Sequence, residues 1–411
     1  MTRDFGPALM ARLDEFAAFT DEPGVLTRFY LSPAHRRAAD CLIGWMAEAG
    51  MTARLDAAGN VVGRYEGVSP GAPALLLGSH IDTIRNAGKY DGNYGVLAAL
   101  AAVEALHRAG ERLPFAIEIV GFGDEEGVRF PVTMTGSRAL AGRLDPSVLK
   151  LRDAEGVSIA EALTGFGGDP TALAGCARRP DELLAYVELH IEQGPVLEAA
   201  GLPAGIVTAI NGASRFEVVL TGQSGHAGTV PMALRRDAVT AAAEMILAIE
   251  RLALETPDLV ATVGRVQAQP GVVNVVPGGA SFTIDLRSPS DAVRDAATGR
   301  LTETLSAIGE RRRIGVALRR THDAAATACA PFLVAQLEAA TRRAEVPVQR
   351  LPSGAGHDAM AVAALTPVGM LFLRCRDGLS HHPDESITAE DAGLGVRILL
   401  DFLRQFRLPG R

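Results

Sequence analysis

The chain has 411 residues, of which 48% are hydrophobic and 21% are charged, a balance typical of a globular protein. Its length exceeds the range over which one hydrophobic core keeps growing, so two domains are expected. The formal net charge is -8 and no long run of Lys or Arg occurs, which argues against nucleic acid and acidic membrane surfaces as partners.

The chain also lacks the patterns of secreted and membrane-spanning proteins. Its first residues place acids among apolar positions, so no secretory signal is expected. No run of about 18 uncharged apolar residues occurs, so no membrane partner is expected. Four cysteines lie far apart without a CxxC pair: Cys41, Cys176, Cys329 and Cys375. We therefore expect reduced, buried thiols in a cytoplasmic protein.

Helical and strand patterns alternate in the N-terminal half. Apolar residues at helical spacing predict helices, and short apolar runs that end in polar residues predict strands. The predicted order is a helix over 34–49, a hairpin over 51–67 that turns at 58–60, a strand over 74–80, a helix over 95–110 and a strand over 115–127. Strands that alternate with helices predict an α/β sheet, whose sites lie at the carboxyl ends of the strands.

A different pattern occupies the middle of the chain. Strands are predicted over 214–222, 259–269, 279–288 and 315–323, and helices over 232–255 and 290–310. This β-α-β-β-α-β order is the split βαβ, ferredoxin-like arrangement of an α+β domain. The α/β pattern then resumes with a helix over 331–344 and a strand over 368–376. Residues 211–323 are therefore predicted to be inserted into an α/β domain of residues 1–210 plus 324–411.

Five separated segments combine imidazole or carboxylate groups with glycines or polar turns: GSHIDT, KYDGNYG, GDEEG, ELHIEQG and LSHHPDE. All five are expected at strand ends of a single sheet, so they should meet at one edge of it. Imidazoles together with carboxylates are the ligands that a borderline cation such as Zn²⁺ or Mn²⁺ accepts. The coincidence of the five segments indicates a metal site.

Each segment taken alone also has a simpler explanation. His80 is an exposed strand-end residue in that view, Asp91 a turn or helix-cap residue, and His190 a core histidine. The acids of 124–126 form a solvated loop, and 381–382 an exposed histidine pair. In an extended segment neighbouring side chains point opposite ways, so one acid of the loop is free to bind metal while the next handles a proton.

These segments, in this order, resemble the metal-dependent aminoacylase/carboxypeptidase superfamily and, within it, the branch of amidases and carbamoylases. The matching strings are GSHIDT, KYDGNYGVLAAL, GDEEGVRF, TGSRALAG, YVELHIEQGPVLE, GHAGTVPMALRRD, NVVPG with FTIDLRS, SGAGHDAMA and LSHHPDE. The resemblance covers nearly the whole chain. VGMLFLRCRDGLSHHPDE and GHAGTVPM are most similar to allantoate amidohydrolases, whereas N-carbamoyl-L-amino acid hydrolases share most of the other strings.

The resemblance implies a mixed-sheet catalytic domain with two divalent metal ions per subunit. His80, Asp91 and His190 would hold one ion, and Asp91, Glu126 and His381 the other. Asp91 would therefore bridge the pair. This ligand set accepts Mn²⁺ or Zn²⁺, and equally Co²⁺ or Ni²⁺.

Two further acids complete the implied centre. Asp82 would orient the imidazole of His80. Glu125 would be the general base that takes a proton from water and returns it to the leaving nitrogen. One departure from the family pattern is His382, where relatives usually carry another polar residue, so the ligand choice between His381 and His382 rests on position alone.

The inserted domain is similar to the family's lid and dimerisation domain, which implies a homodimer. Its His226 corresponds to a histidine that reaches the partner subunit's site and stabilises the oxyanion of the tetrahedral intermediate. The simpler explanation for a histidine in a glycine-rich loop is surface exposure. Which of the two holds depends on whether the chain pairs with a second copy.

The resemblance also implies a pocket for the substrate. Asn274 and Arg287 correspond to a carboxylate-binding pair, with Gln193 nearby, and Arg suits this role because its planar fork binds a carboxylate through two hydrogen bonds. Gly356 and His357 belong to the segment SGAGHDA, which would line the pocket. The alternative for the His-Asp pair of that segment is a structural hydrogen-bonding role.

The expected substrate is a small ureido acid. Hydrolysis of allantoate at its carbamoyl amide, with release of ammonia and carbon dioxide, is the leading hypothesis. N-carbamoyl-L-amino acid hydrolysis on the same scaffold is the nearest alternative, and a peptidase or deacylase is a further one. A metal-binding scaffold without catalysis is disfavoured, because it has no use for a free base such as Glu125 beside a metal pair.

Overall fold

The computed structural model describes residues 4–409 and divides into two compact units. The larger unit runs up to Thr208 and continues over Cys329–Leu351 and from Ala355 onward. The smaller unit comprises Ala209–Ala328 and Pro352–Gly354. Because the smaller unit interrupts the larger one in the sequence, each is described on its own.

A nine-stranded mixed sheet, most of which lies in the larger unit, forms the framework of that unit, with neighbours in the order β1-β2-β4-β3-β5-β16-β6. Its strands are β1 (Thr52–Leu55), β2 (Val61–Tyr65), β3 (Ala74–His80), β4 (Ala116–Phe122), β5 (Leu183–Ile191), β6 (Ala204–Ile210) and β16 (Val368–Leu373), and the short β14 (Thr327–Ala328) and β15 (Arg350–Ser353) pair with β6. The central strands β4, β3, β5 and β16 run parallel, so their carboxyl ends meet at one edge. Every residue of β3, β4 and β16 is buried, as expected for strands covered on both faces.

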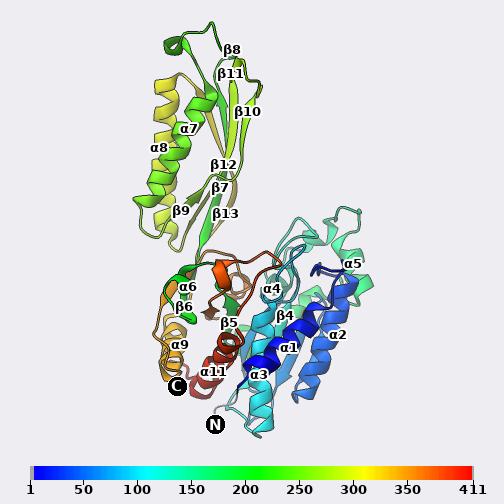
Figure 1. Cartoon of the computed structure of the whole chain (residues 1–411). Helices are drawn as coiled ribbons and strands as arrows, with labels where there is room; N and C mark the ends of the chain where they lie inside the picture. Colours follow the sequence, from blue (N-terminus) through cyan, green and yellow to red (C-terminus); the bar gives the residue numbers. More distant parts are fainter. Residues whose placement is uncertain (1–3, 410–411) are drawn as a thin grey trace. The chain divides into compact units, whose positions relative to one another are not determined.

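Helices pack on this sheet. Their bounds are α1 (Gly6–Ala17), α2 (Pro33–Glu48), α3 (Asn93–Arg108), α4 (Thr135–Leu140), α5 (Ile159–Phe166), α6 (Val196–Ala199), α9 (Pro331–Arg343), α10 (Ala359–Val362) and α11 (Ala389–Gln405). Helices α1, α3 and α11 lie side by side, and α3 also contacts β3 and β5 (Figure 1). Short 3₁₀ turns lie at Pro146–Lys150, Leu173–Cys176, Pro180–Glu182 and Arg376–Gly378. The α/β fold with a mixed sheet that the sequence predicts is therefore confirmed.

The smaller unit has a five-stranded antiparallel sheet in the order β10-β12-β7-β13, with β9 paired to β12. Its strands are β7 (Gly212–Thr221), β9 (Val260–Thr262), β10 (Val266–Gln269), β12 (Gly279–Ser288) and β13 (Gly315–Ala324). Helices α7 (Ala238–Leu254) and α8 (Asp291–Arg312) lie along one face of the sheet (Figure 1). The core lies between sheet and helices, since alternate residues of β12 are buried against it. This is the split βαβ order that the sequence predicts.

Two predicted elements of the smaller unit differ in detail. The helix predicted over 232–255 starts only at Ala238, because the Asp237 side chain accepts the backbone N–H groups of Val239 and Thr240 and so caps α7 there. Met232–Leu234 instead forms a 3₁₀ turn. The strand predicted over 259–269 is interrupted after Thr262 and resumes at Val266, and both pieces pair with β12.

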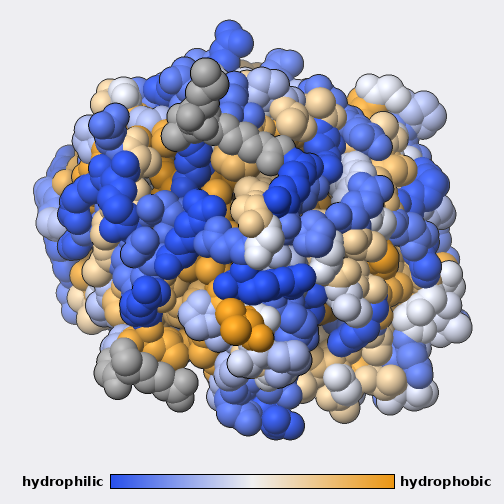
Figure 2. All heavy atoms as spheres, turned by 90° about the horizontal axis from the view of Figure 1, so that it is seen from below, coloured by the Kyte–Doolittle hydropathy of each residue, from blue (hydrophilic) through white to orange (hydrophobic). Residues whose placement is uncertain are grey.

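A separate two-stranded sheet, β8 (Gly225–His226) with β11 (Val275–Val276), lies at one end of the smaller unit, while β9 lies towards the other (Figure 1). On the face drawn in Figure 2, hydrophilic residues dominate and hydrophobic ones form small groups among them. Within residues 4–409, no helix combines the length and the apolarity needed to cross a membrane.

Candidate metal centre

The carboxyl ends of the parallel strands carry the candidate ligands, all of them in the larger unit. His80 is the last residue of β3, His190 lies in β5, and Glu126 follows β4. His381 follows β16, and Asp91 precedes α3. Parallel strands end on the same side of a sheet, so residues separated by up to about three hundred positions become neighbours.

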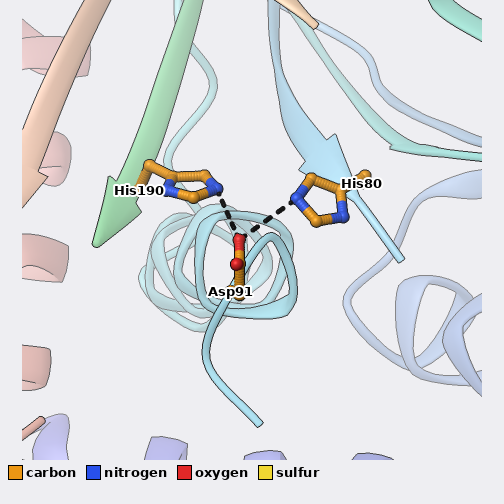
Figure 3. Close-up of side chains that lie close together, drawn as sticks. All are labelled: His80, Asp91 and His190. Carbon is orange, nitrogen blue, oxygen red and sulfur yellow. Dashed lines mark ion pairs between the residues drawn. The ribbon is translucent and has the colours of Figure 1, made fainter. Parts of the chain in front are cut away.

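Asp91 lies at the centre of this group. One carboxylate oxygen, Oδ1, is 3.3 Å from Nε2 of His80 and 3.1 Å from Nε2 of His190, so both imidazoles point at the same atom (Figure 3). The following Gly92 has a positive φ of 66°, and a side chain there would collide with the His80 ring. The turn that presents Asp91 therefore requires glycine.

The second oxygen of Asp91 faces a different set of groups. Its Oδ2 is 3.3 Å from Nε2 of His381, and the same nitrogen is 3.4 Å from Oε2 of Glu126. His80, Asp91 and His190 form one group whose ligand atoms lie within 4.8 Å of one another, and Asp91, Glu126 and His381 form another. Asp91 is thus shared by two ligand sets, one on each of its oxygens.

Backbone carbonyls fix the orientation of two of these imidazoles. Nδ1 of His80 is 3.0 Å from the carbonyl oxygen of Asp82, and Nδ1 of His190 is 2.9 Å from the carbonyl oxygen of Ile191. A proton on each Nδ1 satisfies these carbonyls, so that a metal ion could bind at Nε2 in place of the proton that Nε2 shares with Asp91. The expected contact of the Asp82 carboxylate with His80 is made by the Asp82 carbonyl instead, and the carboxylate oxygen lies 4.0 Å from Nδ1 of His80.

The Asp82 carboxylate supports the acidic turn after β4 instead. Its Oδ1 accepts the backbone N–H of Glu125 at 3.2 Å, and its Oδ2 accepts that of Glu126 at 3.2 Å. Burial raises the pKa of the Glu125 carboxyl well above its usual range, against the opposing charge of His80. Such a carboxyl is a stronger base than an exposed glutamate, as a proton-transferring group requires.

The charges of the group explain why a cation fits it. Burial opposes ionisation of Asp91, yet hydrogen bonds from the three imidazoles outweigh it and lower the pKa of Asp91 well below its usual range. Burial and the charge of Asp91 raise the pKa of Glu126 to about 7. The hydrogen bond to Asp91 raises the pKa of His381 to about 9. Carboxylates and imidazoles buried this close together favour a positive charge among them, and divalent cations would supply it.

Three of the predicted substrate-binding residues also lie beside this centre. Nε2 of Gln193 donates to Asp91 Oδ2 at 2.8 Å. The ring of the buried His357 is 4.5 Å from that of His190. Burial, and to a smaller extent the charge of the nearby His190, lowers the pKa of His357 well below its usual range. A Cβ placed on Gly356 would be 3.8 Å from Oε1 of Glu125.

The remaining predicted residues belong to the smaller unit, where His226 and Asn274 are neighbours and Arg287 lies apart from them. His226 is exposed and pairs in register with Val275, next to Asn274. Arg287 lies near the opposite end of β12, opposite Val260 in the sheet. At about 3.3 Å per residue, roughly 26 Å of strand separates Arg287 from Gly279, where β12 begins near β11. One copy of the smaller unit therefore does not gather Asn274 and Arg287 around one small ligand.

Arg287 already has partners in this structure. Its Nε and Nη2 donate to the two carboxylate oxygens of Asp285 at 2.7 and 3.0 Å, and its Nη1 donates to the Gly354 carbonyl at 2.7 Å. A guanidinium has five N–H donors, so two remain for a substrate. His382, the alternative ligand, lies outside both groups, and its Nδ1 accepts the backbone N–H of Asp384 at 3.2 Å.

Sequence reasoning missed Glu385 and Ser380. The buried Glu385 accepts the backbone N–H groups of Tyr90 and Asp91, each at 3.0 Å. Ser380 lies 3.0 Å from Asp91 Oδ2. Both residues belong to the segment LSHHPDE, within five positions of His381, and this closeness in sequence is the feature that could have indicated them.

A mixed α/β sheet that gathers three imidazoles and two carboxylates at the ends of its parallel strands is the framework of a metal-dependent hydrolase. The chain belongs to peptidase family M20/M25/M40, whose sequence profile matches residues 76–405. This membership, together with the names of its relatives, identifies the chain as a hydrolase that acts on amide bonds.

Relatives with two different names are equally similar to the chain. It is 42% identical over 395 residues to an N-carbamoyl-L-amino acid amidohydrolase of Geobacillus stearothermophilus, covering 96% of this chain and 97% of that protein. It is also 42% identical over 428 residues to an allantoate deiminase of Arabidopsis thaliana, covering 96% and 81%. An amidase of the hydantoinase/carbamoylase family from Burkholderia multivorans has a solved structure with a TM-score of 0.92 and 35% identity over 97% of both chains.

Proposed function

We propose that the chain hydrolyses the carbamoyl amide of a small ureido acid, with allantoate as the leading substrate. The observation that carries this proposal is the position of Asp91, whose two oxygens face two separate ligand sets. The similarity to both an allantoate deiminase and an N-carbamoyl-L-amino acid amidohydrolase supports a carbamoyl group as the target. An N-carbamoyl-L-amino acid is the second candidate, on the same evidence.

The side chains present fit a pair of divalent cations. Imidazole and carboxylate ligands suit Mn²⁺ and Zn²⁺, and Co²⁺ and Ni²⁺ as well. His80, Asp91 and His190 would hold one ion, and Asp91, Glu126 and His381 the other. Bound there, the ions would polarise the substrate carbonyl and make water a better nucleophile.

Glu125 moves the proton in this proposal. It accepts a proton from the attacking water as the carbon–oxygen bond forms, and then delivers this proton to the leaving nitrogen as the carbon–nitrogen bond of the tetrahedral intermediate breaks. Each cleaved carbamoyl group consumes one water and yields an amine, ammonia and carbon dioxide. Asp82 keeps Glu125 in place through the backbone N–H that its carboxylate accepts.

The substrate would be anchored by its acid group and its amide. Arg287 retains two N–H donors for a carboxylate, and Gln193 offers an amide beside Asp91. The neutral imidazole of His357 and the backbone of Gly356, which has no side chain, would line the pocket next to Glu125. A substrate fixed at its carboxylate would present the carbamoyl carbon to the attacking water.

We further propose a homodimer in which the partner subunit supplies His226 and Asn274. These two residues lie at the far end of the smaller unit from Arg287, so the set that surrounds one substrate needs two chains. His226 would stabilise the oxyanion of the tetrahedral intermediate. Large hydrophobic side chains exposed on the smaller unit supply apolar surface for such pairing. They include Met232, Leu234, Leu247, Leu254 and Val273.

One assay separates the two candidate substrates. The purified chain, loaded with Mn²⁺, is supplied with allantoate and, in parallel, with several N-carbamoyl-L-amino acids, and ammonia release is measured. The proposal expects the highest kcat/KM for allantoate. A higher value for an N-carbamoyl-L-amino acid would assign the chain to the second candidate, and no ammonia from either class would contradict hydrolysis of ureido acids.

A further inference from the structure

Glu385 connects two segments of the centre that are far apart in the sequence. Its Oε1 accepts the backbone N–H groups of Tyr90 and Asp91, each at 3.0 Å. Its Oε2 lies 2.9 Å from the hydroxyl oxygen of Ser380, the residue before His381. Glu385 is 2% exposed, and a side chain at Gly88 would collide with it. One buried carboxylate therefore holds both the turn that presents Asp91 and the loop that presents His381.

The Ser380 hydroxyl has two competing acceptors. Its oxygen lies 2.9 Å from Glu385 Oε2 and 3.0 Å from Asp91 Oδ2, and it also accepts an N–H from Gln193 at 3.2 Å. A hydroxyl has one hydrogen to donate, so only one of the two carboxylates receives it at a time. If the Ser380 hydroxyl donates its hydrogen to Glu385, Asp91 Oδ2 receives no hydrogen bond from Ser380.

The geometry points to Glu385 as a positioning residue that draws the Ser380 hydrogen away from Asp91 Oδ2 and so keeps this oxygen available to a divalent cation. The inference rests on the proposed metal centre and adds a residue to it. Glu385 acts through Ser380 and through the backbone of Asp91, and it is not a ligand itself. Its effect should therefore fall on the site formed by Asp91, Glu126 and His381.

Replacing Glu385 by Gln tests this directly. The amide oxygen of Gln can still accept the two backbone N–H groups, so the turn at Asp91 is preserved. Its NH₂ group, however, can only donate to Ser380, whose hydrogen must then go to Asp91 Oδ2. Mn²⁺ binding is measured by competition with a fluorescent chelator. We expect the weaker of two Mn²⁺ equivalents to bind about 10- to 100-fold less tightly, a usual effect of losing such a partner, with the first equivalent little changed.

Ser380→Ala provides the second arm. Without the hydroxyl no hydrogen competes for Asp91 Oδ2, so Ser380→Ala alone and the double variant Glu385→Gln/Ser380→Ala should both bind the second equivalent within about twofold of the wild type. A double variant as weak as Glu385→Gln would overturn the inference, as would weak binding by Ser380→Ala alone. Restored Mn²⁺ binding in the double variant would distinguish a positioning role of Glu385 from a merely structural one.

Asp56 offers a matched control. Its Oδ1 also accepts two backbone N–H groups, from Ala58 and Asn60, each at 2.9 Å, and its Oδ2 accepts the side-chain amide of Asn60 at 2.9 Å. Asp56→Asn should therefore leave both Mn²⁺ equivalents unchanged, and a loss as large as that of Glu385→Gln would overturn the inference. A wild type that binds no Mn²⁺ would contradict the proposed function as well, whereas unchanged binding in Glu385→Gln contradicts this inference alone.

Discussion

The two units of the chain hold their candidate functional residues in different ways. In the larger unit, buried strands bring His80 and His190 to within 3.3 and 3.1 Å of the Asp91 carboxylate. In the smaller unit, His226 is exposed and lies at the opposite end from Arg287. The candidate ligands of the larger unit are thus brought together by folding alone, whereas His226 and Arg287 of the smaller unit are not.

From this difference we expect the two units to have separate tasks. A site for metal and water needs fixed geometry, which four parallel strands and their backbone hydrogen bonds provide. Substrate selection needs side chains that are accessible to an incoming molecule, and exposed side chains on a separate unit meet this need. Substitutions in the larger unit should therefore affect chemistry, and those in the smaller unit should affect substrate binding and the stabilisation of charge.

The largest effect is expected at Glu125. Glu125→Gln keeps the shape of the side chain but removes the proton acceptor, so kcat should fall by about a thousandfold, within the range for losing general acid–base catalysis. Metal content should not change, because Glu125 belongs to neither ligand group. Steady-state ammonia release and elemental analysis check both parts. Normal turnover in this variant would remove Glu125 from the mechanism.

His226→Ala should lower kcat by about a hundredfold, since it removes one oxyanion donor. The fold should survive, because the side chain is exposed. If the partner subunit supplies this residue, mixing His226→Ala with Glu125→Gln should restore activity. Random pairing would give hybrids with one complete site, or about a quarter of the wild-type sites. Refolded mixtures that stay as inactive as the two parents would rule out exchange of His226 between chains.

A smaller effect is expected at Arg287. Arg287→Ala should raise KM about 10- to 100-fold, because hydrogen bonds to a charged group contribute about 1.5–3 kcal/mol each. Arg215 is the matched control, since its Nε also donates to Asp285 at 3.0 Å but the resemblance gives it no role. Arg215→Ala should leave KM near the wild-type value. Equal increases in both variants would trace the effect to Asp285 and not to the substrate.

Much of the fold was open to prediction because the relevant patterns are local. The apolar runs of β3 and β4, the helical spacing of α3 and the strand–helix order of the smaller unit all appear in the sequence. The predicted boundaries of helices were wrong where a single side chain determines where the helix begins. Asp237 caps α7, which therefore starts six residues after the predicted position, and the spacing of hydrophobic residues does not reveal a cap. Helices α1 and α11 were not predicted at all.

The site was predictable as a set of residues, but its hydrogen bonds were not. Strand ends indicated that His80, Asp91 and Glu126 would meet. Glu385 escaped notice because its importance comes from two backbone N–H groups almost three hundred positions away, and no local pattern encodes such a contact. Similarly, only coordinates reveal that the Asp82 carbonyl contacts His80 while its carboxylate supports the turn after β4.

Metal stoichiometry tests the central claim most directly, and the two adjacent histidines make a matched pair. The side chains of His381 and His382 are 51% and 50% exposed, so their substitution disturbs the fold to a similar degree. After dialysis against Mn²⁺, elemental analysis should find two ions per chain in the wild type and in His382→Ala, but one in His381→Ala. A wild type without bound ions, or loss of an ion in His382→Ala with none lost in His381→Ala, would contradict the account.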